Sequence, residues 1–92
     1  MAKFFMLGKY SKAALEAMSA ERTKKAVELL GKSKGKVDSM YALMGSYDLA
    51  LIVDFPDNTE AIKASVALTK STGIAFTTFP AITVEEFDKI TG

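Results

Sequence analysis

Two strand-like runs, residues 37–44 and 47–55, flank Gly45 and Ser46, and this pair of runs constrains the fold most. Glycine as the first of two central residues fits a type II′ hairpin turn, because that position needs a positive φ. Such a turn places Met44 opposite Tyr47, and successive side chains then alternate between two faces. One face collects no charge at all: Met40, Ala42, Met44, Tyr47, Leu49, Leu51 and Val53. The other face also has an apolar middle: Ser39, Tyr41, Leu43, Asp48, Ala50, Ile52 and Asp54.

The remaining residues supply two further strands and the helices. Residues 3–10 and 74–82 are short and apolar, as in strands. Residues 11–34 are rich in Ala, Glu, Lys and Leu, and Ser19 within them predicts either a kink or two helices. Asp57 with Glu60 begins a helix that ends at Gly73, and a Thr83–Glu86 capping box begins a last one that ends near residue 90. The predicted buried stripe of the helix before Gly73 is Ile62, Val66, Leu68, Ala61, Ala64 and Ala67.

The order of elements is therefore βαββαβ with a short C-terminal helix. Right-handed crossovers and one hairpin turn this order into an α+β fold, a ferredoxin-like antiparallel sheet with the strand order 4-1-3-2. The length of 92 residues fits one domain, residues 1–92.

The register of the first strand against the third follows from charge. One register sets Lys3 opposite Asp54 and Lys9 opposite Asp48 at the same time. It also pairs Phe5 with Ile52 and Leu7 with Ala50. Because both helices cover one face of such a sheet, the other apolar face needs a cover, and the simplest is a second copy. We therefore expect a homodimer with sheet-to-sheet packing, on which larger oligomers remain open.

Composition excludes several classes of chemistry. The chain has no His and no Cys, so the sequence predicts no metal site and no thiol chemistry, and nothing in it indicates a cofactor. A net charge of +1 offers nucleic acid or an anionic membrane little attraction. Neither a signal peptide nor a membrane span is visible, so the expected location is the cytoplasm. The βαββαβ order also occurs in RNA-binding domains, but residues 47–54 carry aliphatic and acidic side chains where those domains display aromatic ones.

The hairpin carries a motif, Gly45-x-Tyr47-Asp48, followed by Phe55-Pro56-Asp57 and by the ending Thr83-Val84-Glu85-Glu86-Phe87. This combination resembles the GYD domain family over nearly the whole chain. The resemblance implies membership of the dimeric α/β-barrel superfamily, in which two ferredoxin-like sheets pack together, and it implies no particular reaction.

Four residues are candidates for a site. Asp48 begins a central strand, where it either forms a salt bridge with Lys9 or orients a ligand and takes a proton, which makes it the best catalytic candidate. Tyr47 falls on the helix-covered face as a core residue or a ligand contact, and Tyr10 and Tyr41 are further polar groups on strands. A cleft between the sheet and its helices would hold a small apolar metabolite, unless its lining is ordinary core: Met6, Met40, Met44, Phe76 and Phe79.

Three functions remain open. The absence of a catalytic constellation favours a non-catalytic homo-oligomer that binds a small molecule or acts as a sensory or assembly module. The first alternative is a cofactor-independent enzyme, similar to a monooxygenase or an isomerase, with a pocket near Tyr47 and Asp48. The second is an amino-acid-sensing domain of the kind attached to transcription regulators, here without a DNA-binding half.

Overall fold

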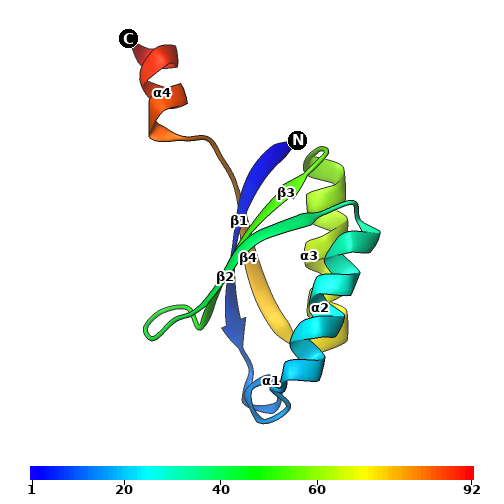
Figure 1. Ribbon diagram of the computed structural model, residues 1–92. Helices are drawn as coiled ribbons and strands as arrows, with labels where there is room; N and C mark the ends of the chain where they lie inside the picture. The colour runs from blue at the N-terminus through cyan, green and yellow to red at the C-terminus, as the bar shows by residue number, and fades with distance from the viewer.

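A four-stranded antiparallel sheet with helices on one face forms the body of the computed structural model, which describes residues 1–92 (Figure 1). The sheet has the order β2-β3-β1-β4, which reads β4-β1-β3-β2 from the opposite edge. This α+β arrangement is compatible with a ferredoxin-like fold. None of the helices has the length and apolar character needed to span a bilayer. The elements are β1 (Ala2–Tyr10), α1 (Lys12–Glu16), α2 (Ala20–Lys32), β2 (Lys36–Ala42), β3 (Leu49–Phe55), α3 (Asn58–Thr72), β4 (Ile74–Ala81) and α4 (Val84–Thr91).

The helices begin at the predicted capping residues. The Ser19 hydroxyl accepts a hydrogen bond from the backbone N of Arg22 at 3.1 Å, so residues 11–34 form two helices rather than one. The Asp57 carboxylate accepts from the backbone N of Glu60 at 2.9 Å, and the Thr83 hydroxyl accepts from that of Glu86 at 3.1 Å. Gly73 ends α3 in the left-handed conformation, with φ of 74°.

The register of β1 against β3 confirms most of the prediction. Lys3 lies opposite Asp54, Phe5 opposite Ile52 and Leu7 opposite Ala50. The ladder ends at Gly8 and Leu49, however, and no ion pair joins Lys9 to Asp48. The predicted salt bridge between these two residues is therefore wrong.

The hairpin between β2 and β3 is wider than predicted. Its last backbone bond runs from Leu43 N to Asp48 O at 2.8 Å, so a loop and not a two-residue turn joins the strands. Gly45 does take a positive φ, 144°. Met44 is fully exposed and Tyr47 half-buried, which corrects their assignment to the core. The hairpin tip extends past the helices, and without a core to pack on, its strands separate early (Figure 1).

A second irregularity lies within β2. From Ser39 to Ala42 the strand has the predicted register, with Tyr41 opposite Ala50, but the register shifts between Val37 and Ser39. This β-bulge leaves Asp38 as an extra residue in the strand.

The core lies between the sheet and the helices α2 and α3. Ala61, Ala64 and Leu68 of α3 face it at helical spacing, and the small alanines let the helix approach the sheet closely. Ile62 and Val66, predicted in the buried stripe, are 62% and 48% exposed because each residue turns the helix by about 100° and places them on the far side. The core cluster consists of Phe4, Met6, Leu30, Leu51, Val53, Phe55, Ala61, Ala64 and Leu68.

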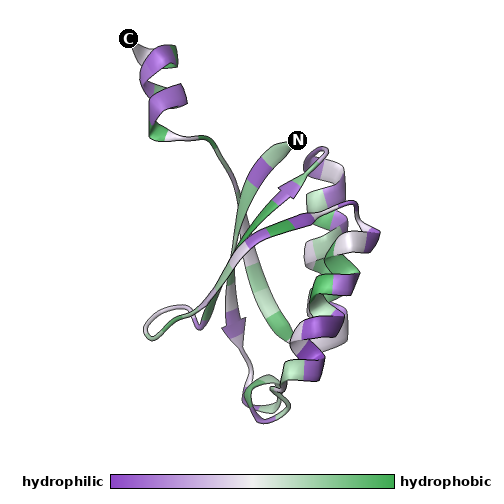
Figure 2. Ribbon diagram, in the orientation of Figure 1, coloured by the Kyte–Doolittle hydropathy of each residue, from purple (hydrophilic) through white to green (hydrophobic).

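The opposite surface of the sheet, here called the outer face, carries apolar side chains that no helix covers. In its central row Phe5 lies between Ile52 of β3 and Phe79 of β4. The large exposed side chains of this face are Phe5, Tyr41, Leu43 and Phe79. The strands are apolar along much of their length, whereas α4 alternates apolar with charged residues (Figure 2).

Candidate functional site

Asp48 lies where β1, β3 and the hairpin loop meet. Its Oδ2 accepts a hydrogen bond from the backbone N of Tyr10 at 2.9 Å, and its backbone N donates to Gly8 O at 2.8 Å. The carboxylate thus takes the place of the backbone carbonyl that the ladder would offer to Tyr10 if β3 continued. The chain departs from the strand here, and the Asp48 side chain satisfies the donor that this departure leaves.

Tyr10 lies beside this carboxylate. Burial raises the pKa of the Tyr10 phenol above its ordinary value of 10.0, the negative charge of Asp48 raises it further, and the Arg22 charge opposes both. The hydroxyl therefore stays protonated near neutral pH, so Tyr10 supplies a donor and Asp48 an acceptor.

The other two candidate residues lie apart from this pair. Tyr47 precedes Asp48 in the hairpin loop and is half-buried there. Tyr41 stands on the outer face, opposite Ala50, and is largely exposed. The structure therefore brings Tyr10 and Asp48 together, keeps Tyr47 next to them in the chain, and leaves Tyr41 on the outer face.

An apolar cleft opens between α2 and the sheet, next to the Tyr10–Asp48 corner. Leu49 and Ile74 line it. Leu49 follows Asp48 in the chain, and Ile74 lies opposite Tyr10 in the sheet. Its volume of about 40 Å³ admits a few water molecules at most. Of the predicted lining, Met40 and Phe76 are present, whereas Met6 is core, and Met44 and Phe79 are exposed elsewhere. The full lining is Met18, Arg22, Thr23, Ala26, Met40, Leu49, Leu51, Leu68, Thr72, Ile74 and Phe76.

Arg22 also belongs to this region, and the sequence did not predict a role for it. Its guanidinium donates to Ala14 O at 2.6 Å and to Thr72 O, so it ties α1 and α3 to α2 at the edge of the cleft. The sequence feature that could have identified Arg22 is its position in the first turn of α2, where the helix dipole disfavours a cation. A cation at that position needs a partner outside its own helix.

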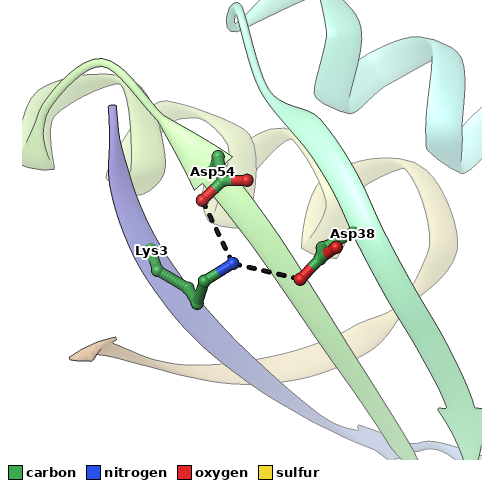
Figure 3. A network of polar contacts seen from close by, with 3 residues as sticks. All are labelled: Lys3, Asp38 and Asp54. Atoms are coloured by element: carbon green, nitrogen blue, oxygen red, sulfur yellow. Dashed lines mark hydrogen bonds and ion pairs between the residues drawn. The ribbon is translucent and has the colours of Figure 1, made fainter. Parts of the chain in front are cut away.

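A separate polar cluster stands at the other end of the outer face. The Lys3 Nζ lies 3.0 Å from Asp38 Oδ2 and 3.4 Å from Asp54 Oδ1 (Figure 3). The hydrogen bond that Lys3 donates to Asp38 is the largest cause that raises the pKa of Lys3, and Asp54 adds to it. The β-bulge places Asp38 within reach of Lys3. The regular pairing inferred from the sequence assigns residue 38 to the helix-covered face, and so missed this partner.

We predict that Asp48→Ala destabilises the fold by about 1–3 kcal/mol, because it leaves the part-buried Tyr10 N–H without an acceptor. Asp48→Asn keeps an amide oxygen at the same place and is expected to lose less. Urea unfolding at one fixed protein concentration measures both. Equal stability of wild type and Asp48→Ala would show that the bond contributes nothing.

The raised pKa of Tyr10 predicts a loss of stability in alkali. A raised folded-state pKa contributes stability that is present below the ordinary value of 10.0 and is lost as pH rises through the folded value. Tyr10→Phe lacks this group, so the stability advantage of the wild type over the variant should fall as pH increases above about 10. Urea midpoints of both proteins across this range measure the difference, and parallel curves would contradict the prediction.

Comparison with known proteins places the chain. A solved structure of the leucine response regulatory protein LrpA from Mycobacterium tuberculosis superimposes with a TM-score of 0.59 at 10% identity. The match covers 89% of this chain but 51% of the regulator, so the chain spans about half of that protein's length and the likeness extends to the fold alone. No curated protein matches the chain significantly. The family model of the GYD domain matches residues 4–91, and the chain therefore belongs to the GYD domain family.

Proposed function

We propose that this protein is a non-catalytic homo-oligomer that binds a small molecule and acts as a sensory or assembly module. The outer face carries the proposal. Phe5, Tyr41 and Phe79 are exposed on it with no helix to cover them, although apolar side chains in a contiguous patch of this kind usually mark an interface. A second copy of the sheet, packed face to face by a two-fold axis, covers this patch with an identical one.

The corner formed by Tyr10 and Asp48 supports the binding role. The neutral phenol donates and the carboxylate accepts, next to an apolar cleft lined by Met18, Met40 and Phe76. We propose that a small, mostly apolar metabolite enters this cleft and turns its polar end to the corner. Unbranched Met side chains change rotamer readily, so the small cleft widens as the ligand enters. Tyr47 adjoins this site, and Tyr41 belongs to the interface side.

An amino acid is the second candidate ligand. The likeness to LrpA, a leucine response regulatory protein, supports an amino-acid-sensing domain, here without the half of the regulator that this chain does not span. Asp48 would pair with the ammonium and Arg22 with the carboxylate. A cofactor-independent enzyme similar to a monooxygenase or isomerase is less well supported, because the Asp48 carboxylate already accepts the Tyr10 backbone N–H and is less free to take a proton.

Native mass spectrometry of freshly purified protein tests the proposal. We expect a dimer, or a whole-number multiple of a dimer, with retained small-molecule mass. Asp48→Asn should keep the assembly and lose the ligand, whereas the matched variant Asp54→Asn on the outer face should keep the ligand. Monomers alone would refute the assembly. The same retained small-molecule mass in the wild type and in Asp48→Asn would refute the binding site. For the amino-acid alternative, added leucine should raise the melting temperature of the wild type and not of Asp48→Asn.

A further inference from the structure

The helix α4 lies apart from the rest of its own chain. Val84, Phe87 and Ile90 recur along it at a spacing that places them on one side, and all three are exposed. A helix of eight residues is marginal in water by itself, because the nucleation of a helix is unfavourable and short helices recover little. The apolar side of α4 therefore needs a surface to pack on.

The position of α4 relative to the sheet restricts where that surface lies. β4 ends at Ala81, opposite Lys3 of β1, whereas the hairpin loop begins beyond the pair of Gly8 and Leu49. The helix and the loop thus leave the sheet at opposite ends. Both extend on the side away from α2 and α3 (Figure 1). In a face-to-face dimer this is the side of the partner.

Two two-fold arrangements bring the outer faces together. An axis parallel to the strands sets like ends together, so that α4 meets α4. An axis perpendicular to the strands, in the plane between the sheets, sets unlike ends together, so that α4 meets the partner's hairpin end.

Charge distinguishes these arrangements. At the α4 end the sheet carries Asp38 and Asp54 together with Lys3 and Lys36, whereas α4 itself has three carboxylates to one ammonium: Glu85, Glu86, Asp88 and Lys89. At the opposite end Lys9 and Lys12 are exposed and form no ion pair. Like ends together would set acid against acid, whereas unlike ends set acid against lysine.

We propose that α4 docks on the partner chain, at the hairpin end of the partner's sheet. Its apolar side covers Leu43 and Met44 of the second copy, which are exposed at the base and the tip of the loop. Its carboxylates face Lys9 and Lys12 of that copy. This inference rests on the proposed homodimer, and it adds that each chain holds the other with its last helix.

Cysteine cross-linking tests the docking, because the chain has no cysteine of its own. The double variant Met44→Cys/Ile90→Cys changes two exposed side chains, so it should fold normally. We expect a short bis-maleimide to convert most of it to covalent dimer on a denaturing gel. The two positions lie beyond opposite ends of the sheet, with the length of β1 from Lys3 to Gly8, about 17 Å at 3.3 Å per residue, between them, so a short linker does not join them within one chain.

The single variants are the controls. Met44→Cys alone and Ile90→Cys alone should stay monomeric on the denaturing gel, whereas an equimolar mixture of the two, after subunit exchange, should give dimer. Linking of Ile90→Cys to itself would show that α4 meets α4 and overturn the docking while leaving the homodimer intact. A native dimer in which none of the variants links would overturn it as well. A native monomer would refute the homodimer, and the docking with it.

Discussion

Phe5→Asp is expected to convert the protein to a monomer. Phe5 sits at the centre of the outer face, between Ile52 and Phe79. Loss of a central aromatic side chain from an interface typically costs 2 kcal/mol or more, and a two-fold interface carries the change twice. The resulting loss of about 4 kcal/mol raises the dissociation constant roughly a thousandfold. The desolvation of a buried carboxylate adds to this effect. Sedimentation velocity over a dilution series measures the constant.

Val66→Asp is the matched control for this substitution. Val66 of α3 is 48% exposed and Phe5 is 39% exposed, so the two changes introduce a charge at similar solvent access. Val66 lies on the opposite side of the molecule, beyond the helix layer, and its variant should sediment as the wild type does. If both variants remain dimeric, the outer face is not the interface. If both dissociate, the effect of Phe5→Asp is not specific to that face.

Phe55→Ala is expected to cause the largest loss of fold stability, about 3–5 kcal/mol. The ring is fully buried and meets Phe4 edge to face, with 5.7 Å between ring centroids. On another side it fills the space next to Gly35, where a Cβ would lie only 2.6 Å from Phe55 Cε1. Since these neighbours belong to a strand and to the turn before β2, they cannot easily collapse into the cavity. Urea unfolding at a fixed protein concentration measures the loss.

Two further variants keep this prediction testable if Phe55→Ala does not fold. Phe55→Leu removes less volume and should lose less stability than the alanine variant. Ile62→Ala truncates an aliphatic side chain that is 62% exposed and should change stability by about 0.5 kcal/mol or less. A loss with Ile62→Ala as large as that with Phe55→Leu would contradict the assignment of the core.

The strand register was predictable from the sequence because several residues agreed on it. Lys3 with Asp54 and Phe5 with Ile52 each favour the pairing that the structure contains. Lys9 and Asp48 also indicated this register, but the salt bridge predicted between them does not form. The ladder stops one pair earlier, and the carboxylate turns to a backbone N–H instead of a lysine. Charge patterning identifies the partner strands but not whether a backbone donor competes for the carboxylate.

The features that the sequence did not reveal depend on tertiary context. Gly45-Ser46 indicates a tight turn only if the strands pair up to it, and the free hairpin tip offers no packing to hold them together. The Tyr10–Asp48 contact depends on where β3 ends, and the role of Arg22 depends on carbonyls of α1 and α3. Regular alternation also predicts the wrong side of the sheet for Asp38, because it assumes an unbroken strand.

Asp38, the extra residue in β2, can be present or absent without a change in how the strand pairs. Val37 pairs with Val53, and Ser39 pairs with Ile52, its direct neighbour, so a chain without Asp38 would have the same two pairs in an uninterrupted ladder. The extra residue is not needed for the strand order, and the flanking side chains face the same side of the sheet with or without it. What it contributes is the closer of the two carboxylates on Lys3. The gain or loss of one codon there would shift the net charge at that end of the sheet by one unit and leave the packing beneath it unaltered.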